Sequence, residues 1–225
     1  MKTSAELHDG GLVAIVGAGP AGLTLARLLQ MRGFAVKIFE RDASPTSRPQ
    51  GGSLDLRPSL AQHAIDAAGL DDAFKRVARS DAKEFKLIDS QGNPIPGGGE
   101  ETHEDAGPEI DRADLRQLLL ESVAPDTVAW GYAIAAVHHR NDGRWKIECA
   151  DQPPFVADLV VGADGKGSRV RNRLTPARPS YTGHTIVATT IRKDLWRGSA
   201  ISDVLGEGVR SNDVRIRTDR DLQYA

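Results

Sequence analysis

A glycine-rich turn between an apolar strand and a helix constrains the fold of this chain more than any other feature. Residues 12–16 (LVAIV) form a continuous apolar run, which is typical of a strand buried on both faces of a parallel sheet. The turn GAGPAG at 17–22 follows at once, and the apolar stripe of residues 23–33 predicts a helix. Residues 35–39 predict a second strand that leads to Glu40. This order predicts a βαβ unit.

The residue types in the turn suit the binding of a dinucleotide. Gly17 permits a tight turn out of the strand, Gly19 lets a pyrophosphate approach the backbone, and Gly22 lets the helix pack close to the sheet. The helix N-terminus offers free N–H groups to the phosphates, and Glu40 can accept hydrogen bonds from ribose hydroxyls. The predicted cofactor-binding turn consists of Gly17, Ala18, Gly19, Pro20, Ala21 and Gly22. A purely structural glycine turn is the alternative. The acidic Glu40 disfavours a 2′-phosphate and therefore NADP at this turn, whereas FAD and NAD both remain open.

Two further helices are indicated in the middle of the chain. Residues 58–69 begin with a proline and end with a glycine, and a strand over 84–90 and a turn over 91–100 follow. Residues 111–122 predict another helix, with Asp111 as its N-cap. The apolar faces expected to be buried are Leu60, Ala64, Ile65 and Ala68 on the first helix and Leu115, Leu118 and Leu119 on the second.

Arg112 occupies an unusual position, because it lies in the first turn of the helix predicted over 111–122. A lone cation there is unfavourable against the helix macrodipole. The position makes sense if Arg112 faces an anion, such as a cofactor phosphate. An exposed surface arginine is the alternative, and this segment alone does not decide between the two.

The second half of the chain predicts a hairpin and a further parallel strand. Residues 133–150 contain two alternating segments joined by an Asp-Gly turn, a strong hairpin signal. Residues 159–161 predict another buried strand, which ends in GADG, and residues 168–169 are expected to open a helix. Asp164 then lies at the carboxyl end of a parallel strand, where doubly wound sheets bind ligands.

Composition excludes several other functions. The formal net charge of −2 gives no basic field, so nucleic-acid binding is disfavoured. The apolar run at 12–16 is far too short to span a bilayer, and residues 1–10 lack the apolar core of a signal peptide. The acidic segment 100–105 carries one histidine and no ligand repeat, so no metal site is expected. The single cysteine, Cys149, is expected to be a packing residue of a cytoplasmic protein.

The motifs resemble those of a known family when they are taken together. The segments GAGPAGL, Glu40-Arg41, DRADLR and DLVVGADGKGSRVR occur in the order and spacing seen in class A FAD-dependent monooxygenases, which have the aromatic-hydroxylase fold. The segments GGSLDLRPS and PEIDRADLRQLL are most similar to the tetracycline-degrading branch. The resemblance covers roughly residues 10–190 and favours FAD over NAD. It implies an α/β fold, with a Rossmann-like FAD-binding domain of parallel sheet, helices and a small antiparallel meander, followed by an incomplete antiparallel substrate-domain sheet.

The resemblance also implies roles for individual residues. Glu40 resembles the acid that binds the adenosine ribose, and Arg41 resembles the basic residue near the adenine. Arg112 matches an arginine that contacts the flavin. Asp55 matches an aspartate that contacts FAD in the tetracycline branch, and Arg48 falls where that branch has an arginine linked to NADPH.

Family chemistry implies NAD(P)H as a transient reductant and O₂ as the source of one oxygen atom for a small organic substrate, aromatic or polyketide-like, such as a tetracycline. Asp164 resembles the aspartate of a motif that contacts both FAD and NADPH. The cofactor carries the hard chemistry, so no catalytic side chain is nominated. The expected division is an FAD-binding domain at 1–175, with substrate-domain strands inserted at about 80–105, and a substrate-binding segment at 176–225.

One departure from the family is large. Its members carry a second glycine-aspartate motif beneath the flavin ring, and residues 176–225 contain no such segment. A truncated monooxygenase is therefore expected, and its unfinished sheet favours self-association. A non-catalytic FAD-binding remnant is the alternative. An NAD-dependent dehydrogenase fits the first βαβ unit but does not explain DRADLR and GADG.

Overall fold

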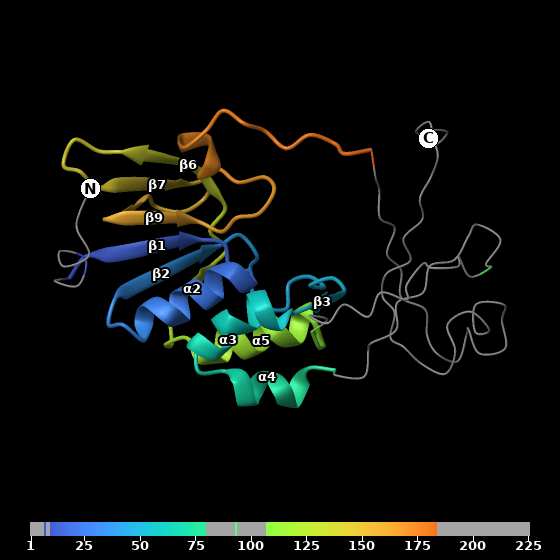
Figure 1. Ribbon diagram of the computed structural model, residues 1–225. Coiled ribbons are helices and arrows are strands. Elements are labelled where there is room, and N and C mark those ends of the chain that lie inside the picture. The colour runs from blue at the N-terminus through green and yellow to red at the C-terminus, as the bar shows by residue number, and fades with distance from the viewer. Residues whose placement is uncertain (1–6, 8–9, 80–92, 94–106, 184–225) are drawn as a thin grey trace.

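The computed structural model describes residues 7, 10–79, 93 and 107–183 of the 225-residue chain (Figure 1). The strand predicted over 84–90, the turn over 91–100 and the acidic segment 100–105 fall largely or wholly outside the described residues. The same holds for residues 184–225, which make up most of the expected substrate-binding segment. No helix among the described residues is long and apolar enough to cross a membrane.

A parallel sheet of four strands forms the centre of the fold, in the order β5-β2-β1-β9. Its strands are β1 (Leu12–Val16), β2 (Ala35–Glu40), β5 (Val128–Trp130) and β9 (Leu159–Gly162). Ile15 of β1 lies opposite Ile38 on one side and Val161 on the other, in parallel register. Residues 13–16 are almost completely buried, because β1 has a strand on either side and layers on both faces. The predicted βαβ unit is confirmed.

Helices cover one face of this sheet, and Figure 1 shows them gathered on the side away from β6 and β7. They are α2 (Pro20–Gln30), α3 (His63–Ala67), α4 (Asp71–Val77) and α5 (Arg112–Ser122). Val13 and Ile15 of β1 point into this layer, where they share a core with Leu23, Leu115 and Leu119. The face predicted for the helix over 111–122 is therefore confirmed.

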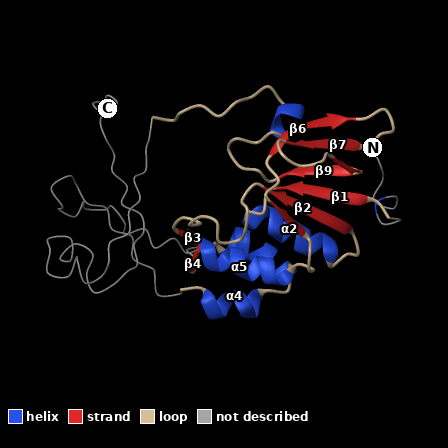
Figure 2. Cartoon of the chain, turned by 180° about the vertical axis from the view of Figure 1, so that it is seen from behind, coloured by secondary structure: helices blue, strands red, loops and turns tan. Residues whose placement is uncertain are grey.

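The other face of the sheet is covered by an antiparallel meander, seen from behind in Figure 2. It consists of β6 (Ile134–His139), β7 (Trp145–Cys149) and β8 (Phe155–Ala157), in that order. Ala14 and Val16, the alternate residues of β1, pack here against Val137 and Ile147. The hairpin predicted over 133–150 is confirmed, and Gly143 at its turn has φ +80°.

The structure differs from the sequence-based expectation in two local elements. Residues 58–69 begin as a π-helical turn, Pro58–Gln62, before α3, and this wider turn leaves Leu60 69% exposed instead of in the core. The helix expected to open at residues 168–169 is one 3₁₀ turn, Arg171–Arg173. The Ser168 hydroxyl accepts a hydrogen bond from the Arg171 N–H at 2.9 Å, which gives this backbone an alternative to a continuing α-helix.

Candidate functional site

The carboxyl ends of β1, β2 and β9 meet at one edge of the parallel sheet, and the candidate site is built there. β1 runs into the turn at 17–22, β2 ends on Glu40, and β9 leads to Asp164. The Gly17 N–H donates to the Phe39 carbonyl oxygen at 2.8 Å, and the Ala163 N–H donates to the Val16 carbonyl oxygen at 2.8 Å. These bonds tie the three strand ends together. This is the edge at which open α/β sheets bind ligands.

The three glycines of the turn have different surroundings. Gly17 has φ +106°, and a Cβ there would lie 2.4 Å from the Ala163 carbonyl oxygen. A Cβ at Gly22 would lie 2.1 Å from the Gly17 carbonyl oxygen, so α2 packs too closely for a side chain. A Cβ at Gly19 would meet no atom within 4 Å, and Gly19 has an extended backbone with φ −79°. The packing of the chain therefore requires glycine at two positions, whereas Gly19 opens onto free space.

The N-terminus of α2 adds an electrostatic reason to place an anion at this open position. Gly19 is the N-cap residue, Pro20 is the first helical residue, and no side chain caps the helix. The first turn of α2 contains no acidic residue. The initial N–H groups of a helix have no partner within the helix, and the macrodipole places partial positive charge beside them. A phosphate fits this end of α2.

Glu40 is buried directly beside the turn. Its side chain is only 9% exposed, and its Oε2 accepts a hydrogen bond from the Ala18 N–H at 2.7 Å. Its Oε1 accepts another from the Asp42 N–H at 3.0 Å. An ionised carboxylate has about four acceptor positions, so two more bonds can be accepted. The carboxylate is held at the turn and still has capacity for ribose hydroxyls.

Arg116 belongs to this arrangement, although it was not among the predicted site residues. It lies on α5, and its side chain is 3% exposed. Its Nε donates to the Ala18 carbonyl oxygen at 2.9 Å, and its Nη1 donates to the Pro45 carbonyl oxygen at 3.1 Å. Its guanidinium also lies 5.3 Å from the ring centroid of Trp130. The only signal in the sequence was an arginine next to an apolar stripe, which is equally typical of a surface residue.

The loop after β2 carries two of the other predicted residues. Arg41 is exposed immediately after Glu40. Arg48 is half-exposed, and its Nε donates to Asp42 Oδ1 at 3.1 Å. The structure therefore places Arg48 beside the buried Asp42, which follows Glu40 by two residues.

A small antiparallel pair of strands carries Asp55 at one end and leads into Arg112 at the other. β3 (Ser53–Asp55) pairs with β4 (Glu109–Asp111), and Arg112 follows β4 as the first residue of α5. The Arg112 N–H donates to the Gly52 carbonyl oxygen at 3.1 Å, and the side chain passes Gly51. Asp55 accepts a hydrogen bond from the Gly107 N–H at 3.0 Å.

Arg112 carries a free charge in this part of the molecule. Its side chain is exposed, and no carboxylate of the described residues pairs with it. Asp111 occupies the N-cap position as predicted but does not cap the helix, because its side chain pairs with Arg79 at 3.0 Å. An uncompensated cation at the positive end of a helix is unfavourable unless an anion binds there.

Asp164 lies next to the glycine turn. Its Oδ2 accepts a hydrogen bond from the Arg169 N–H at 2.6 Å, and its Oδ1 is buried without a hydrogen-bond partner among the described residues. A Cβ at Gly17 would lie 3.1 Å from the Asp164 N atom, so the two segments are in direct contact. A buried carboxylate oxygen without a donor is costly, and a ligand hydroxyl or N–H could satisfy it.

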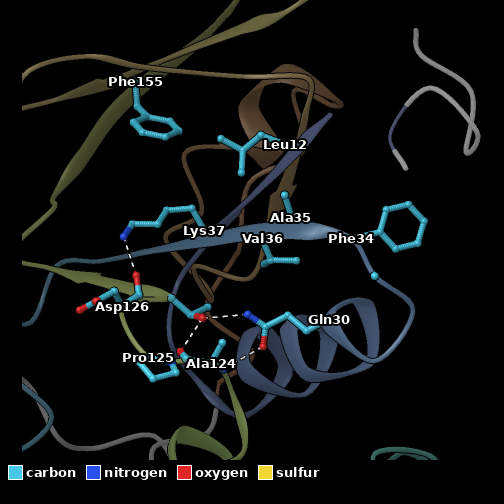
Figure 3. A pocket seen from close by; sticks show the side chains of 12 residues that line it. Leu12, Gln30, Phe34, Ala35, Val36, Lys37, Ala124, Pro125, Asp126 and Phe155 are labelled. Atoms are coloured by element: carbon cyan, nitrogen blue, oxygen red, sulfur yellow. Dashed lines mark hydrogen bonds between the residues drawn. The ribbon is translucent and has the colours of Figure 1, made fainter. Parts of the chain in front are cut away.

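A cavity of about 530 Å³ lies at the opposite edge of the sheet (Figure 3). Its lining includes Leu12, Phe34 and Val36, near the amino ends of β1 and β2. The polar groups that line it are already bonded to each other: Gln30 Nε2 donates to Thr127 Oγ1 at 2.8 Å, and Lys37 Nζ donates to the Asp126 carbonyl oxygen at 2.6 Å (Figure 3). The cavity lies at the amino ends of the strands, away from the glycine turn, Glu40 and Asp164.

No three potential metal ligands cluster in the described part of the chain. His138 and His139 diverge as expected of strand neighbours. His138 lies 3.3 Å from Glu148, whereas the ring of His139 packs edge-on against Trp145. Burial raises the pKa of the Cys149 thiol, which disfavours the reactive thiolate.

Comparison with known proteins agrees with this geometry. Residues 12–196 match the family described as the FAD binding domain. The monooxygenase asqM of Emericella nidulans is 33% identical over 214 residues, which are 87% of this chain and 47% of that protein. The 3-amino-4-hydroxybenzoate 2-monooxygenase PtmB3 of Streptomyces platensis is 34% identical over 181 residues, 77% of this chain and 44% of that protein. The chain spans about half the length of the curated relatives it matches.

A solved structure supports the fold. The crystal structure of the tetracycline destructase Tet(51) has a TM-score of 0.57 to this chain at 22% identity, covering 79% of this chain and 44% of that one. The match to the FAD binding domain extends over the turn, Glu40, Arg112 and Asp164, and it supports FAD over NAD. The chain belongs to the FAD binding domain family of the class A flavin monooxygenases.

Proposed function

We propose that this chain is the FAD-binding part of a monooxygenase that uses NAD(P)H and O₂ to place one oxygen atom on a small organic substrate. The observation that carries the proposal is the open Gly19 at the uncapped N-terminus of α2, with the buried Glu40 beside it. This arrangement offers both donors for a pyrophosphate and an acceptor for ribose hydroxyls. Its occurrence in a family of FAD binding domains makes FAD the cofactor of choice.

The residues at the sheet edge would each bind a different part of the cofactor. The turn at 17–22 would hold the pyrophosphate, Glu40 the adenosine ribose, and Arg41 would lie near the adenine. Arg112 is exposed at a helix N-terminus and pairs with no carboxylate of the described residues, so it suits a flavin phosphate or oxygen. Asp55 would contact the cofactor from β3, at the far end of the β3–β4 pair from Arg112.

FAD supplies the redox and oxygen chemistry when it is bound. Asp164, whose buried Oδ1 has no donor among the described residues, would bind the cofactor and lie near the path of NADPH. Arg48 would attract the reductant, because its half-exposed guanidinium keeps free N–H groups beyond its bond to Asp42. The task that we propose for these residues is to bind and orient the two cofactors, and we assign none of them as a nucleophile.

The substrate we propose is an electron-rich aromatic or polyketide-like compound. PtmB3 is named as a 3-amino-4-hydroxybenzoate 2-monooxygenase, and Tet(51) is named as a tetracycline destructase. The compound 3-amino-4-hydroxybenzoate is a small aromatic acid, and a tetracycline is a polycyclic polyketide. Because this chain spans about half of such proteins, a non-catalytic FAD-binding remnant is the second candidate function.

The test is the absorption spectrum of the purified 225-residue chain, followed by titration of the flavin-free protein with FAD. We expect the two visible bands of oxidised flavin and saturable binding. Gly19→Val should abolish binding without unfolding the chain, because its Cβ meets no protein atom within 4 Å. Gly143→Asn, at the tip of the β6–β7 hairpin, is the matched control, since asparagine tolerates its φ of +80°.

Two outcomes would count against the proposal. A folded wild-type chain that binds no FAD would refute the flavin assignment. Equal FAD affinity in the wild type and Gly19→Val would show that the pyrophosphate does not lie on this turn.

A further inference from the structure

A buried ionic cluster lies beneath the glycine turn, and nothing in the proposed function uses its cation. Arg116 projects from α5, and its Nη2 lies 4.0 Å from Glu40 Oε2 and 3.6 Å from Asp42 Oδ2. The exposed fractions of these side chains are 3% for Arg116, 9% for Glu40 and 8% for Asp42. The guanidinium is therefore shielded from solvent and from any ligand at the sheet edge. It can act on a cofactor only through its neighbours.

Ala18 is held from both sides by members of this cluster. Its N–H donates to Glu40 Oε2 at 2.7 Å, and its carbonyl oxygen accepts from Arg116 Nε at 2.9 Å. Ala18 lies between Gly17 and Gly19. The two bonds therefore fix the backbone that leads to the open position Gly19. Arg116 also donates to the Pro45 carbonyl oxygen at 3.1 Å, and this bond fixes the loop that follows Glu40. One side chain thus joins α5, the turn and the loop after β2.

A purely structural role explains this cluster poorly. Replacing a buried ion pair with apolar residues often costs nothing or stabilises a protein, because desolvating charges is expensive. Here Asp42 Oδ2 is buried and has no hydrogen-bond partner in the part of the chain that the structure describes, so the cluster is not fully satisfied there. An arrangement of this kind is better explained by the need to hold a charged acceptor, Glu40, in one orientation.

We propose that Arg116 is a positioning residue for the adenosine ribose of the cofactor. By binding Ala18 and balancing the two neighbouring carboxylates, it fixes the Glu40 carboxylate so that its free acceptor positions receive both ribose hydroxyls. The inference rests on the proposed FAD site. It predicts that Arg116 determines how well the chain distinguishes a ribose from a deoxyribose, and not merely how tightly it binds flavin.

The experiment measures the dissociation constants of FAD and of an FAD analogue with 2′-deoxyadenosine on the 225-residue chain. In the wild type we expect the analogue to bind about tenfold more weakly, the effect of one lost charge-assisted hydrogen bond. Arg116→Lys keeps the charge but cannot contact both Ala18 and Pro45, and it should reduce this ratio to about twofold. Arg116→Met should remove the discrimination wherever that variant folds.

Matched variants separate positioning from general damage. Arg32→Lys, at an exposed arginine whose Nη1 donates to the Leu28 carbonyl oxygen, should keep the wild-type ratio. Glu40→Gln should lose the discrimination by itself, and adding Arg116→Lys to it should change the ratio no further. Thermal unfolding of each flavin-free variant shows whether it is folded.

The results that overturn the inference differ from those that overturn the FAD site. If Arg116→Lys weakens both ligands by the same factor and keeps the tenfold ratio, Arg116 is structural and the inference is wrong. A wild-type chain that binds both ligands equally well also refutes the inference, while FAD binding stands. Only a folded wild-type chain that binds neither ligand removes the proposed function as well.

Discussion

The glycines at positions 19 and 22 are three residues apart, and their substitution is expected to change the stability of the chain by very different amounts. Gly22→Ala places a Cβ 2.1 Å from a backbone carbonyl oxygen, so α2 must move away from β1. We expect the free energy of unfolding to fall by about 3 kcal/mol, the upper range for overpacking. Gly19→Ala should change it by less than about 0.5 kcal/mol, as at an unconstrained surface position. Urea unfolding of the flavin-free chain measures both, and similar losses in the two variants would contradict the distinction.

Arg112 provides a second prediction for a single residue. Arg112→Ala should weaken FAD binding by about 1.5–3 kcal/mol, the contribution of one charge-assisted hydrogen bond. The stability of the flavin-free chain should not fall, because the side chain is exposed and its cation lies at the positive end of α5. Fluorescence titration with FAD measures the affinity, and Arg32→Ala is the control. An unchanged affinity would make Arg112 an ordinary surface arginine.

Among the structural elements, the β3–β4 pair depends on an arginine outside it. Arg79 is 22% exposed and lies 3.0 Å from Asp111 Oδ1 and 3.3 Å from Glu109 Oε2. Its backbone also exchanges two hydrogen bonds with Glu109. Because β4 leads directly into α5, these contacts hold the start of the helix that carries Arg112 and Arg116.

Arg79→Met is therefore expected to lower the free energy of unfolding by about 1–2 kcal/mol, since it leaves two half-buried carboxylates without their cation. Arg76→Met, at an exposed position of α4, should have almost no effect. Chemical denaturation of the two variants provides the comparison. Equal stability of Arg79→Met and the wild type would mean that the backbone bonds alone hold β4 in place.

The elements differ in how far their sequences predict them. Residues 12–40 are predictable because the apolar run, the glycine turn and the amphipathic helix all indicate the same βαβ unit. Residues 53–55 and 109–111 are not, since three-residue strands of mixed polarity carry no periodic signal. The π turn at 58–62 follows from local backbone bonding, which the apolar spacing of the segment does not reveal.

At the scale of the whole molecule, the sequence predicts which segments form the site but not how they are joined. Parallel strands place their carboxyl ends at one edge, so the turn, Glu40 and Asp164 were expected to meet. The meander could be predicted as a hairpin, yet its packing behind β1 depends on small alternate residues such as Ala14, which have no distinct signal. Arg116 could not be predicted for a related reason, because its contacts come from segments distant in sequence.

The distribution of the candidate residues also predicts how the chain reacts with oxygen. In the described part of the chain, these residues line one open edge of a sheet, and the described cavity lies at the other edge. Coupled oxygen transfer requires the exclusion of water from the flavin. We therefore expect the 225-residue chain with FAD to oxidise NADPH and to reduce most of the O₂ to H₂O₂, even when an electron-rich aromatic acid is present.

Three rates measured together test this expectation: NADPH consumption, peroxide release and oxygenation of 3-amino-4-hydroxybenzoate as a probe. Gly19→Val with the same amount of added FAD corrects for the reaction of free flavin, because that variant should not bind the cofactor. Peroxide formed in nearly equal amount to the NADPH consumed would indicate a flavin site that reacts but does not shield its oxygen chemistry. Oxygenated product in equal amount to NADPH would contradict the prediction and assign complete monooxygenase activity to this chain. NADPH consumption no faster than in the Gly19→Val control would contradict it in the other direction and favour the non-catalytic FAD-binding remnant.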